Sequence, residues 1–322
     1  MPDGVCIICG GPLVDWFKAP GDWRKPDADI SFNLRRCPKD GYGRIDPIPQ
    51  QAVLDDHYMI EGYYTQERSN KAKSGPPSLP WRAMARFAKT VDTGVKNRKT
   101  LIADELKRRG GADVLEIGCG HGDNLVALSE HGFEAYGIEP DPDAMAADPD
   151  FPATVHRGTA EDPPSFYDGR TFDGVVMSHV LEHCVDPAKA MRTVRRFLKP
   201  GGIAYIEVPN ADCVDFRSAK LAWPHLGVPR HVHFLNGDHL EALATEAGLE
   251  VLSRTHLGYM RQFTPGWHTF GDEMRAFYRG KTGAGTLKEW GIPYYMWLLA
   301  MTAFAPKRYK YDSVAVLLTV KE

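Results

Sequence analysis

A short apolar strand that runs into a glycine-rich turn is the feature that most constrains this fold. Residues 114–117 read Val-Leu-Glu-Ile, and glycine follows at positions 118, 120 and 122. A helix pattern begins near Asp123. Glycine permits positive φ and lets the backbone approach a ligand closely. Ligands of open parallel sheets bind beyond the carboxyl ends of the strands, so we expect a ligand site at this turn.

Strand and helix patterns alternate along the chain after this turn. The other expected strands cover residues 134–138, 153–156, 172–177, 203–208, 249–252 and 313–320. Strands separated by helical stretches indicate βαβ units and a parallel sheet that is covered on both faces. The sequence therefore predicts an α/β fold with a doubly wound, seven-stranded, mostly parallel, Rossmann-like sheet.

The region before this fold has a different composition. Three of the six cysteines lie in the first forty residues, and residues 71–80 contain three Pro, two Ser and one Gly, as a linker does. We expect a small Cys-rich, zinc-ribbon-like module over residues 1–75 and a larger domain over residues 76–322, beginning with one helix from about Trp81 to Arg109. Two long segments of the larger domain, about 209–235 and 257–311, are expected to supply a helical lid on the substrate side.

Composition limits the partners. The 39 Lys and Arg against 42 Asp and Glu give a formal charge of −3, which argues against a global attraction to nucleic acid or anionic membrane, although local basic patches stay possible. The apolar run 293–306 is shorter than the roughly 20 residues needed to span a bilayer. We expect a buried or lid helix there, in preference to an interfacial anchor. The N-terminus has no secretory pattern and the cysteines are sparse, so we expect a cytoplasmic protein.

Two acidic residues indicate which ligand the turn binds. Asp123 stands where the dinucleotide fingerprint G-x-G-x-x-G needs its third glycine, which disfavours an NAD-dependent sugar enzyme. Glu116 precedes the first glycine by two residues and suits a cationic ligand. Glu139 ends the second strand, from where a carboxylate can accept hydrogen bonds from both ribose hydroxyls.

With these residues the chain resembles the class I S-adenosylmethionine (SAM)-dependent methyltransferases. The resemblance covers roughly residues 112–252, through segments 116–122, 139–141, 158–162, 172–179 and 198–202. It implies SAM as cofactor, a turn at 198–202 and an antiparallel seventh strand at 313–320. Thr159 stands where many relatives carry Asp. The implied cofactor-binding residues are Glu116, Gly118, Cys119, Gly120, Gly122, Asn124, Glu139, Pro140, Thr159, Ala160, Glu161, Ser178 and His179.

The segment His179-Val-Leu-Glu-His183 also matches H-x-x-E-H, an inverted zinc-protease signature. That chemistry needs both histidines on one helix face. Here the segment directly follows a predicted strand inside a complete series of methyltransferase motifs, which disfavours a protease. We expect His179 to line the cofactor. His183 is expected to face cofactor or substrate, with a merely hydrogen-bonded histidine as the alternative.

The N-terminal cysteines have the spacing of a zinc module. Cys6 and Cys9 are separated by two residues, and Cys37 is followed at the same spacing by Asp40. Thiolates at this spacing can share one tetrahedral ion. Many methyltransferases similar to this chain begin with such a module, but with a fourth Cys where Asp40 stands. We predict bound zinc, with Cys6, Cys9, Cys37 and Asp40 as ligands, against the alternative of a fold held by packing alone.

Methyl transfer to oxygen or carbon also requires removal of a proton from the acceptor. Histidine titrates near neutrality, so His231 is the first candidate for the general base and His183 the second, with a structural role for His231 as the alternative. The candidate substrate contacts are Tyr63, Tyr64, His225 and His233.

The favoured function is that of a SAM-dependent methyltransferase acting on an oxygen or carbon of a small molecule or activated sugar. One alternative is an RNA base methyltransferase, because some of these enzymes also carry an N-terminal zinc module. Another is a non-catalytic scaffold or regulator with the same fold. The acceptor and the oligomeric state stay open at this point.

Overall fold

The computed structural model describes residues 3–28, 30–58, 78–95, 97–142, 148–282 and 291–320. The chain forms two compact units. The parallel-sheet unit comprises residues 95–209, 235–255 and 313–322, and the N-terminal unit comprises residues 1–94, 210–234 and 256–312. The two long segments 210–234 and 256–312 therefore belong to the same unit as the Cys-rich region. The domain boundary expected near residue 75 lies outside the described residues.

The parallel-sheet unit is built on a seven-stranded sheet with the strand order β10-β11-β8-β7-β4-β5-β6. Strands β4, β5, β6, β7 and β8 pair in parallel, and β11 pairs antiparallel with β8. The antiparallel strand near the C-terminus is therefore confirmed. The strands are β4 (Asp113–Ile117), β5 (Glu134–Glu139), β6 (Thr154–Arg157), β7 (Phe172–Ser178), β8 (Leu198–Pro209), β10 (Glu250–Leu257) and β11 (Ser313–Thr319).

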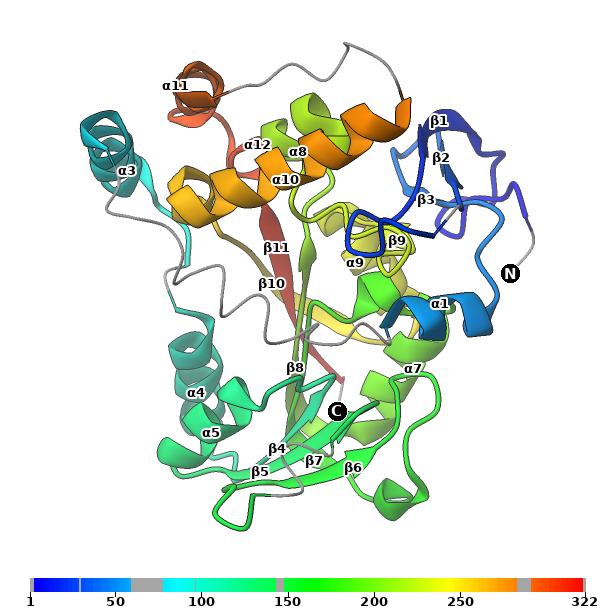
Figure 1. Ribbon diagram of the computed structural model, residues 1–322. Helices are drawn as coiled ribbons and strands as arrows, with labels where there is room; N and C mark the ends of the chain where they lie inside the picture. The colour runs from blue at the N-terminus through cyan, green and yellow to red at the C-terminus, as the bar shows by residue number, and fades with distance from the viewer. Residues whose placement is uncertain are drawn as a thin grey trace. The chain divides into compact units, whose positions relative to one another are not determined.

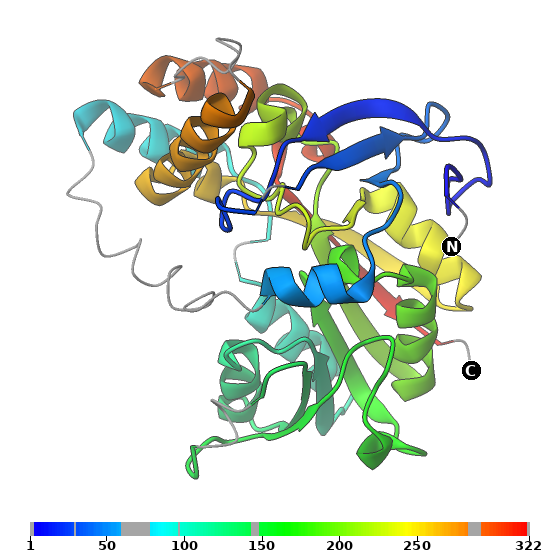
Figure 2. The same cartoon turned by 45° about the vertical axis from the view of Figure 1, so that its right-hand side comes forward.

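Helices cover both faces of this sheet. Figures 1 and 2 show α4 and α5 on one side and α7 and α9 on the other. Side chains on both faces of the inner strands are buried, as a doubly wound parallel sheet requires. The predicted fold class is confirmed. These helices are α4 (Arg98–Arg108), α5 (Asp123–Glu130), α7 (Pro187–Phe197) and α9 (Gly237–Glu246).

Two local predictions were wrong. The helix expected from Trp81 to Arg109 is divided into α3 (Leu79–Val91) and α4. The chain is extended at Asp92, and the side chain of Asn97 starts a new helix by accepting the N–H groups of Lys99 and Thr100. The turn expected at 198–202 lies within β8, where the pairing with β7 is irregular between Phe172 and Gly174.

The N-terminal unit contains a second sheet, with the order β1-β2-β3-β9 and antiparallel pairing. Its strands are β1 (Val14–Ala19), β2 (Phe32–Arg36), β3 (Gly43–Ile45) and β9 (His233–Phe234). The last strand comes from the segment after β8. Arg230 anchors the same segment: its buried guanidinium donates hydrogen bonds to Asp22 at 2.6 and 3.1 Å. His57 contacts the same carboxylate at 3.0 Å.

Three of the six α-helices described in the N-terminal unit come from the long segment before β11. The six are α1 (Gln51–Tyr58), α3, α8 (Val214–Ala219), α10 (Pro265–Thr282), α11 (Gly291–Thr302) and α12 (Lys307–Lys310). One buried core cluster joins α3 and α11 through Trp81, Met84, Tyr295 and Leu298. None of the helices described here is long and apolar enough to cross a bilayer.

Candidate functional site

The glycine turn lies between the end of β4 and the start of α5. Gly118, Gly120 and Gly122 have φ values of 71°, 55° and 76°, which L residues with side chains rarely adopt. Gly118 is also required by packing, because a Cβ atom there would lie 2.3 Å from Cγ2 of Val180. At Gly120 a Cβ atom would meet nothing within 4 Å. The two glycines therefore have different roles: one packs the turn and the other leaves the backbone open.

The end of β5 is joined to this turn. Glu139 is 3% exposed, and its Oε2 accepts a 2.8 Å hydrogen bond from the backbone N–H of Gly120. The following carbonyl, of Pro140, accepts from Arg157 Nη1 at 2.5 Å. A carboxylate is thus fixed beside the glycine turn at the carboxyl edge of the sheet, as the sequence predicted.

Three buried polar atoms near the ends of β4 and β7 have no hydrogen-bond partner among the described residues. They are Oε2 of Glu116, Oδ1 of Asn124 and Oγ of Ser178. The other carboxylate oxygen of Glu116 accepts a 2.6 Å hydrogen bond from Asn124. Burial raises the pKa of Glu116 to about 7, because the charged form loses its hydration. Buried polar atoms are normally paired, so this set indicates a ligand that supplies donors.

The loop after β6 contains the residues expected near the adenine ring. Thr159 and Asp162 form a local turn, in which the Thr159 hydroxyl accepts the N–H of Asp162 at 2.9 Å. Ala160 is buried. The carboxylate of Glu161 accepts the backbone N–H groups of Val185 and Asp186 at 3.1 and 2.7 Å, and so anchors the segment that starts α7. Contact between these residues and a ligand stays a prediction. Cys119 is buried in an apolar cluster with Leu125 and Ala135.

His179 lies between two carboxylates. Its Nδ1 is 3.3 Å from Glu182 Oε1 and its Nε2 is 3.2 Å from Glu207 Oε1, so both ring nitrogens face acceptors. Burial alone would lower the pKa of His179, but the two carboxylates outweigh it and raise the pKa to about 9. Its φ of 57° and the short 3-10 turn Leu181–His183 give the H-x-x-E-H segment no single helix face. This disagrees with a protease site.

The residues around His179 were not identified from the sequence. Glu207 is 1% exposed, and this burial by itself would raise its pKa. The contact with His179 outweighs burial and lowers the pKa to about 2. The Tyr205 hydroxyl donates to the same carboxylate at 2.9 Å, and Arg98 lies 3.5 Å from it. An acidic residue in the otherwise apolar strand Ile203–Val208 was the available signal, because a buried acid needs partners.

His231 belongs to the N-terminal unit. Its Nδ1 lies 2.7 Å from the backbone carbonyl of His225, and a carbonyl can only accept, so Nδ1 carries the proton. In the neutral ring Nε2 then has the lone pair, which is the arrangement a general base needs. The ring packs on Gly227, where a Cβ atom would come within 2.7 Å of it. His183 belongs to the parallel-sheet unit and is half-buried at the end of the 3-10 turn. A catalytic role for either residue stays a prediction.

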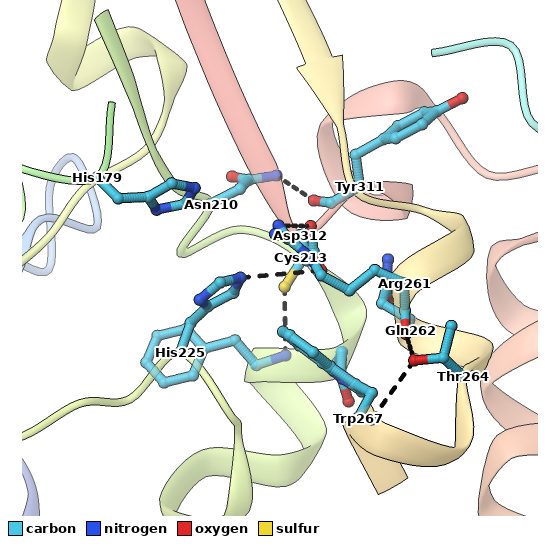
Figure 3. Close-up of polar contacts among 12 residues, drawn as sticks. His179, Asn210, Cys213, His225, Arg261, Gln262, Thr264, Trp267, Tyr311 and Asp312 are labelled. Carbon is cyan, nitrogen blue, oxygen red and sulfur yellow. Dashed lines mark hydrogen bonds and ion pairs between the residues drawn. The ribbon is translucent and has the colours of Figure 1, made fainter. Parts of the chain in front are cut away.

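The candidate substrate residues differ in their surroundings. His225 lies in a polar cluster of the N-terminal unit, where its Nε2 is 3.9 Å from Asp312, which also binds Arg261 at 2.6 and 2.8 Å (Figure 3). His233 is buried, and its Nδ1 is 2.5 Å from the hydroxyl of Tyr42. Tyr63 and Tyr64 lie outside the described residues. Contact between any of these and a substrate stays a prediction.

The four predicted metal ligands come together. One ligand atom from each of Cys6, Cys9, Cys37 and Asp40 lies within 4.8 Å of all the others. The sulfurs of Cys9 and Cys37 are 3.5 Å apart, close to the roughly 3.8 Å edge of a tetrahedral site with Zn–S bonds of about 2.3 Å.

Two turns with the same hydrogen bonds present these ligands. In the first, Cys6 O accepts from Gly10 and Cys6 N–H donates to Gly11. In the second, Cys37 O accepts from Gly41 and Cys37 N–H donates to Tyr42. Asp40 therefore occupies in the second turn the position that Cys9 occupies in the first. The donor set and its geometry fit a tetrahedral metal ion.

Comparisons with known proteins agree with this architecture. The profile of a family described as "Methyltransferase domain" matches residues 94–254, half of the chain. A ubiquinone biosynthesis O-methyltransferase of Pseudomonas aeruginosa is 31% identical over 173 residues, which cover 48% of this chain and 72% of that protein. A protein of the same description from Thiobacillus denitrificans is 28% identical over 166 residues, covering 46% and 69% of the two chains.

The chain is also similar to solved structures. A 1,6-didemethyltoxoflavin-N1-methyltransferase of Burkholderia thailandensis, solved with S-adenosylhomocysteine (SAH), aligns over 92% of this chain and 97% of its own. Its sequence identity is 12% and its TM-score is 0.48.

Proposed function

The chain belongs to the class I SAM-dependent methyltransferases, and on that premise we propose that it transfers a methyl group to a hydroxyl oxygen of a small molecule. The observation that carries the proposal is the glycine turn whose Gly120 N–H binds the Glu139 carboxylate at the carboxyl edge of a parallel sheet. The similarity to O-methyltransferases over half of the chain supports oxygen as the acceptor atom. The alternatives are an activated sugar as substrate and a carbon atom as acceptor. The experiment with a panel of acceptors, described below, distinguishes them.

The residues at the turn suit SAM chemically. Glu116 Oε2 and Asn124 Oδ1 are acceptors that need donors, and the ammonium group of SAM has three. Glu139 would hold the ribose hydroxyls, and Ser178 would contact the methionine part of the ligand. When bound, SAM supplies a methyl group on a positively charged sulfur. The protein's own contribution is to orient the ligands and to exclude water.

We propose His231 as the group that removes the acceptor proton. The hydrogen bond from its Nδ1 to the His225 carbonyl fixes the tautomer and leaves Nε2 able to accept that proton. An oxygen acceptor loses its proton as the O–CH3 bond forms and the S–CH3 bond breaks. His183 is the second candidate for the same step.

We also propose that the Cys6, Cys9, Cys37 and Asp40 cluster holds one zinc ion with a structural role. The equivalent hydrogen bonds of the two turns support Asp40 as the fourth ligand. Carboxylates ligate zinc, and a site with four protein ligands leaves no position for a substrate. Zinc would then stabilise the β1-β2-β3-β9 sheet without taking part in methyl transfer.

The proposed function is tested with purified protein and isotopically labelled SAM. A panel of small alcohols and phenols, nucleotide sugars and transcribed RNA is incubated with the protein, and mass spectrometry locates the label. We expect label on a hydroxyl oxygen of a small molecule. Label on RNA alone, or no transfer to any acceptor together with no binding of SAH, would overturn the proposal.

The role of His231 is tested with His231→Ala. Loss of a general base slows the chemical step by about 10²–10⁴-fold, so kcat should fall while SAH binding is kept. His131→Ala is the matched control, because His131 is an exposed histidine at the end of α5. Full turnover in His231→Ala would show that His231 is not the general base. His183→Ala would then be tested in the same way.

A further inference from the structure

Helix α11 is apolar around its whole circumference, yet one face of it is exposed. Its buried face carries Tyr295, Leu298 and Leu299. The opposite face, continued by the residues after the helix, is exposed at Met296 (57%), Trp297 (43%), Met301 (52%) and Phe304 (86%). Trp297 and Met301 are four residues apart, and Met296 is next to Trp297, so the three side chains form a stripe along one side of the helix. A helix that is hydrophobic all round is normally buried, so the stripe needs an occupant.

Helix α3, which packs on α11, also has exposed apolar side chains. It lies beside α11 (Figure 2), and the two helices share one core cluster of the N-terminal unit. Leu79 and Phe87 of α3 are exposed. Six of the nine large hydrophobic side chains that are exposed in the described parts of the chain belong to these two segments. We call this surface the α3–α11 face, defined by Leu79, Phe87, Met296, Trp297, Met301 and Phe304. Exposed apolar residues are normally scattered singly over a protein surface. Six of them on two neighbouring segments therefore indicate an interaction site.

The charges on the same two segments all have one sign. Residues 79–91 and 291–310 contain no Asp or Glu, although Asp and Glu outnumber Lys and Arg in the whole chain. Arg82, Arg86, Lys89 and Lys307 are exposed. Of the other cations in these segments, Arg308 pairs with Asp212 at 2.7 Å and Lys310 is buried. The apolar face is thus accompanied by four exposed positive charges in a chain whose total charge is negative.

We propose that the α3–α11 face binds the surface of an anionic lipid bilayer. Apolar side chains, including a Trp, enter the boundary between headgroups and acyl chains, and the flanking Lys and Arg attract anionic headgroups. A second copy of the chain suits the face less well, because pairing two copies face to face would bring eight exposed cations together. For residues 293–306 this proposal favours an interfacial helix over the buried or lid helix expected from the sequence.

Flotation of the full-length protein with lipid vesicles tests the proposal. Vesicles of phosphatidylcholine with 30% phosphatidylglycerol are compared with pure phosphatidylcholine, at low and high salt. Each Lys or Arg near an anionic surface contributes about fivefold in partitioning, so we expect at least a tenfold preference for the anionic vesicles, which salt weakens. The variant Trp297→Ser/Phe304→Ser should lose most of the binding, and Arg86→Glu should reduce it by about fivefold or more.

Matched controls separate this face from general stickiness and from misfolding. Leu252→Ser removes an exposed apolar residue on β10, and Lys107→Glu reverses an exposed charge on α4. Both should bind vesicles as wild type does. The unfolding midpoint of each variant shows that it is folded. Equal binding by wild type and Trp297→Ser/Phe304→Ser, or no binding to anionic vesicles, would overturn the proposal. A concentration-dependent dimer that this double variant abolishes would assign the face to a second copy instead.

Discussion

The backbone N–H of Gly120 donates a 2.8 Å hydrogen bond to the carboxylate of Glu139, and so joins the glycine turn after β4 to the end of β5. Because a ribose would use the same carboxylate, Glu139→Ala should remove charge-assisted bonds worth about 1.5–3 kcal/mol each and weaken SAH binding by at least tenfold. Calorimetry and the SAH-induced rise in the unfolding midpoint measure this. Glu134→Ala, at the other end of β5, is the control. An unchanged SAH response in Glu139→Ala would contradict the assignment.

Gly118 and Val180 should be energetically coupled. A Cβ atom at Gly118 would lie 2.3 Å from the Val180 side chain, so Gly118→Ala should destabilise the protein by about 2–4 kcal/mol through crowding and a strained φ. The same change in a Val180→Ala background should cost at least about 1 kcal/mol less. Gly110→Ala is the control for the φ cost alone, since Gly110 has φ 72° and open space. Urea unfolding measures all four variants, and additive effects would contradict the coupling.

Glu116 should make cofactor binding depend on pH. Its pKa is raised to about 7 by burial, so at pH 6 most of the protein carries the neutral acid. A cationic ammonium group favours the ionised form, and SAH affinity should therefore fall about tenfold as the pH drops from 8 to 6. Glu116→Gln should bind SAH weakly and without this pH dependence. Calorimetry at pH 6, 7 and 8 tests both, and a Gln variant with the wild-type slope would exclude Glu116 as its source.

The His179–Glu207 pair should stabilise the fold over a defined pH range. The pKa of His179 is raised to about 9, so its stabilising contribution is complete below the usual value of about 6.5 and is lost as the pH rises through 9. The pKa of Glu207 is lowered to about 2, so this group stays ionised throughout that range.

The free energy of unfolding of the wild type should thus decrease by up to about 3 kcal/mol between pH 6.5 and 9.5. His179→Asn, which tolerates the positive φ, should remove most of this decrease, whereas His131→Gln should not. Urea unfolding at several pH values between about 6.5 and 9.5 measures the free energy of unfolding of each variant. Equal slopes for wild type and His179→Asn would mean that other groups cause the pH dependence.

The cysteine cluster should hold one zinc ion per chain. Cys37→Ser should lose the metal and lower the unfolding midpoint, because metal binding contributes directly to folding of small modules. Asp40→Asn should retain metal with lower affinity, since three thiolates remain. Elemental analysis and the thiolate absorption of the cobalt-substituted protein measure this, with Cys184→Ala, outside the cluster, as control. Unchanged zinc content in Cys37→Ser would exclude the site.

Much of the fold was predictable because its signals are local. The glycine turn, the acid that ends β5 and the alternation of strands with helices each lie within a few residues, and the carboxyl ends of parallel strands meet at one edge. The equivalent spacing of Cys6–Cys9 and Cys37–Asp40 predicted that four ligand atoms would meet. The break between α3 and α4 was missed, because the cap at Asn97 interrupts a pattern that otherwise looks like one continuous helix.

The sequence by itself therefore determined the fold class, the family and the position of the glycine turn. Only the tertiary structure decided which side chains share an environment. It pairs His179 with Glu207 and Tyr42 with His233, residues that are 28 and 191 positions apart, and it leaves one face of α11 exposed. The physical reason is that local patterns depend on backbone geometry and solvation along the chain, whereas a pKa, a packing clash or an exposed face depends on neighbours that folding brings from elsewhere.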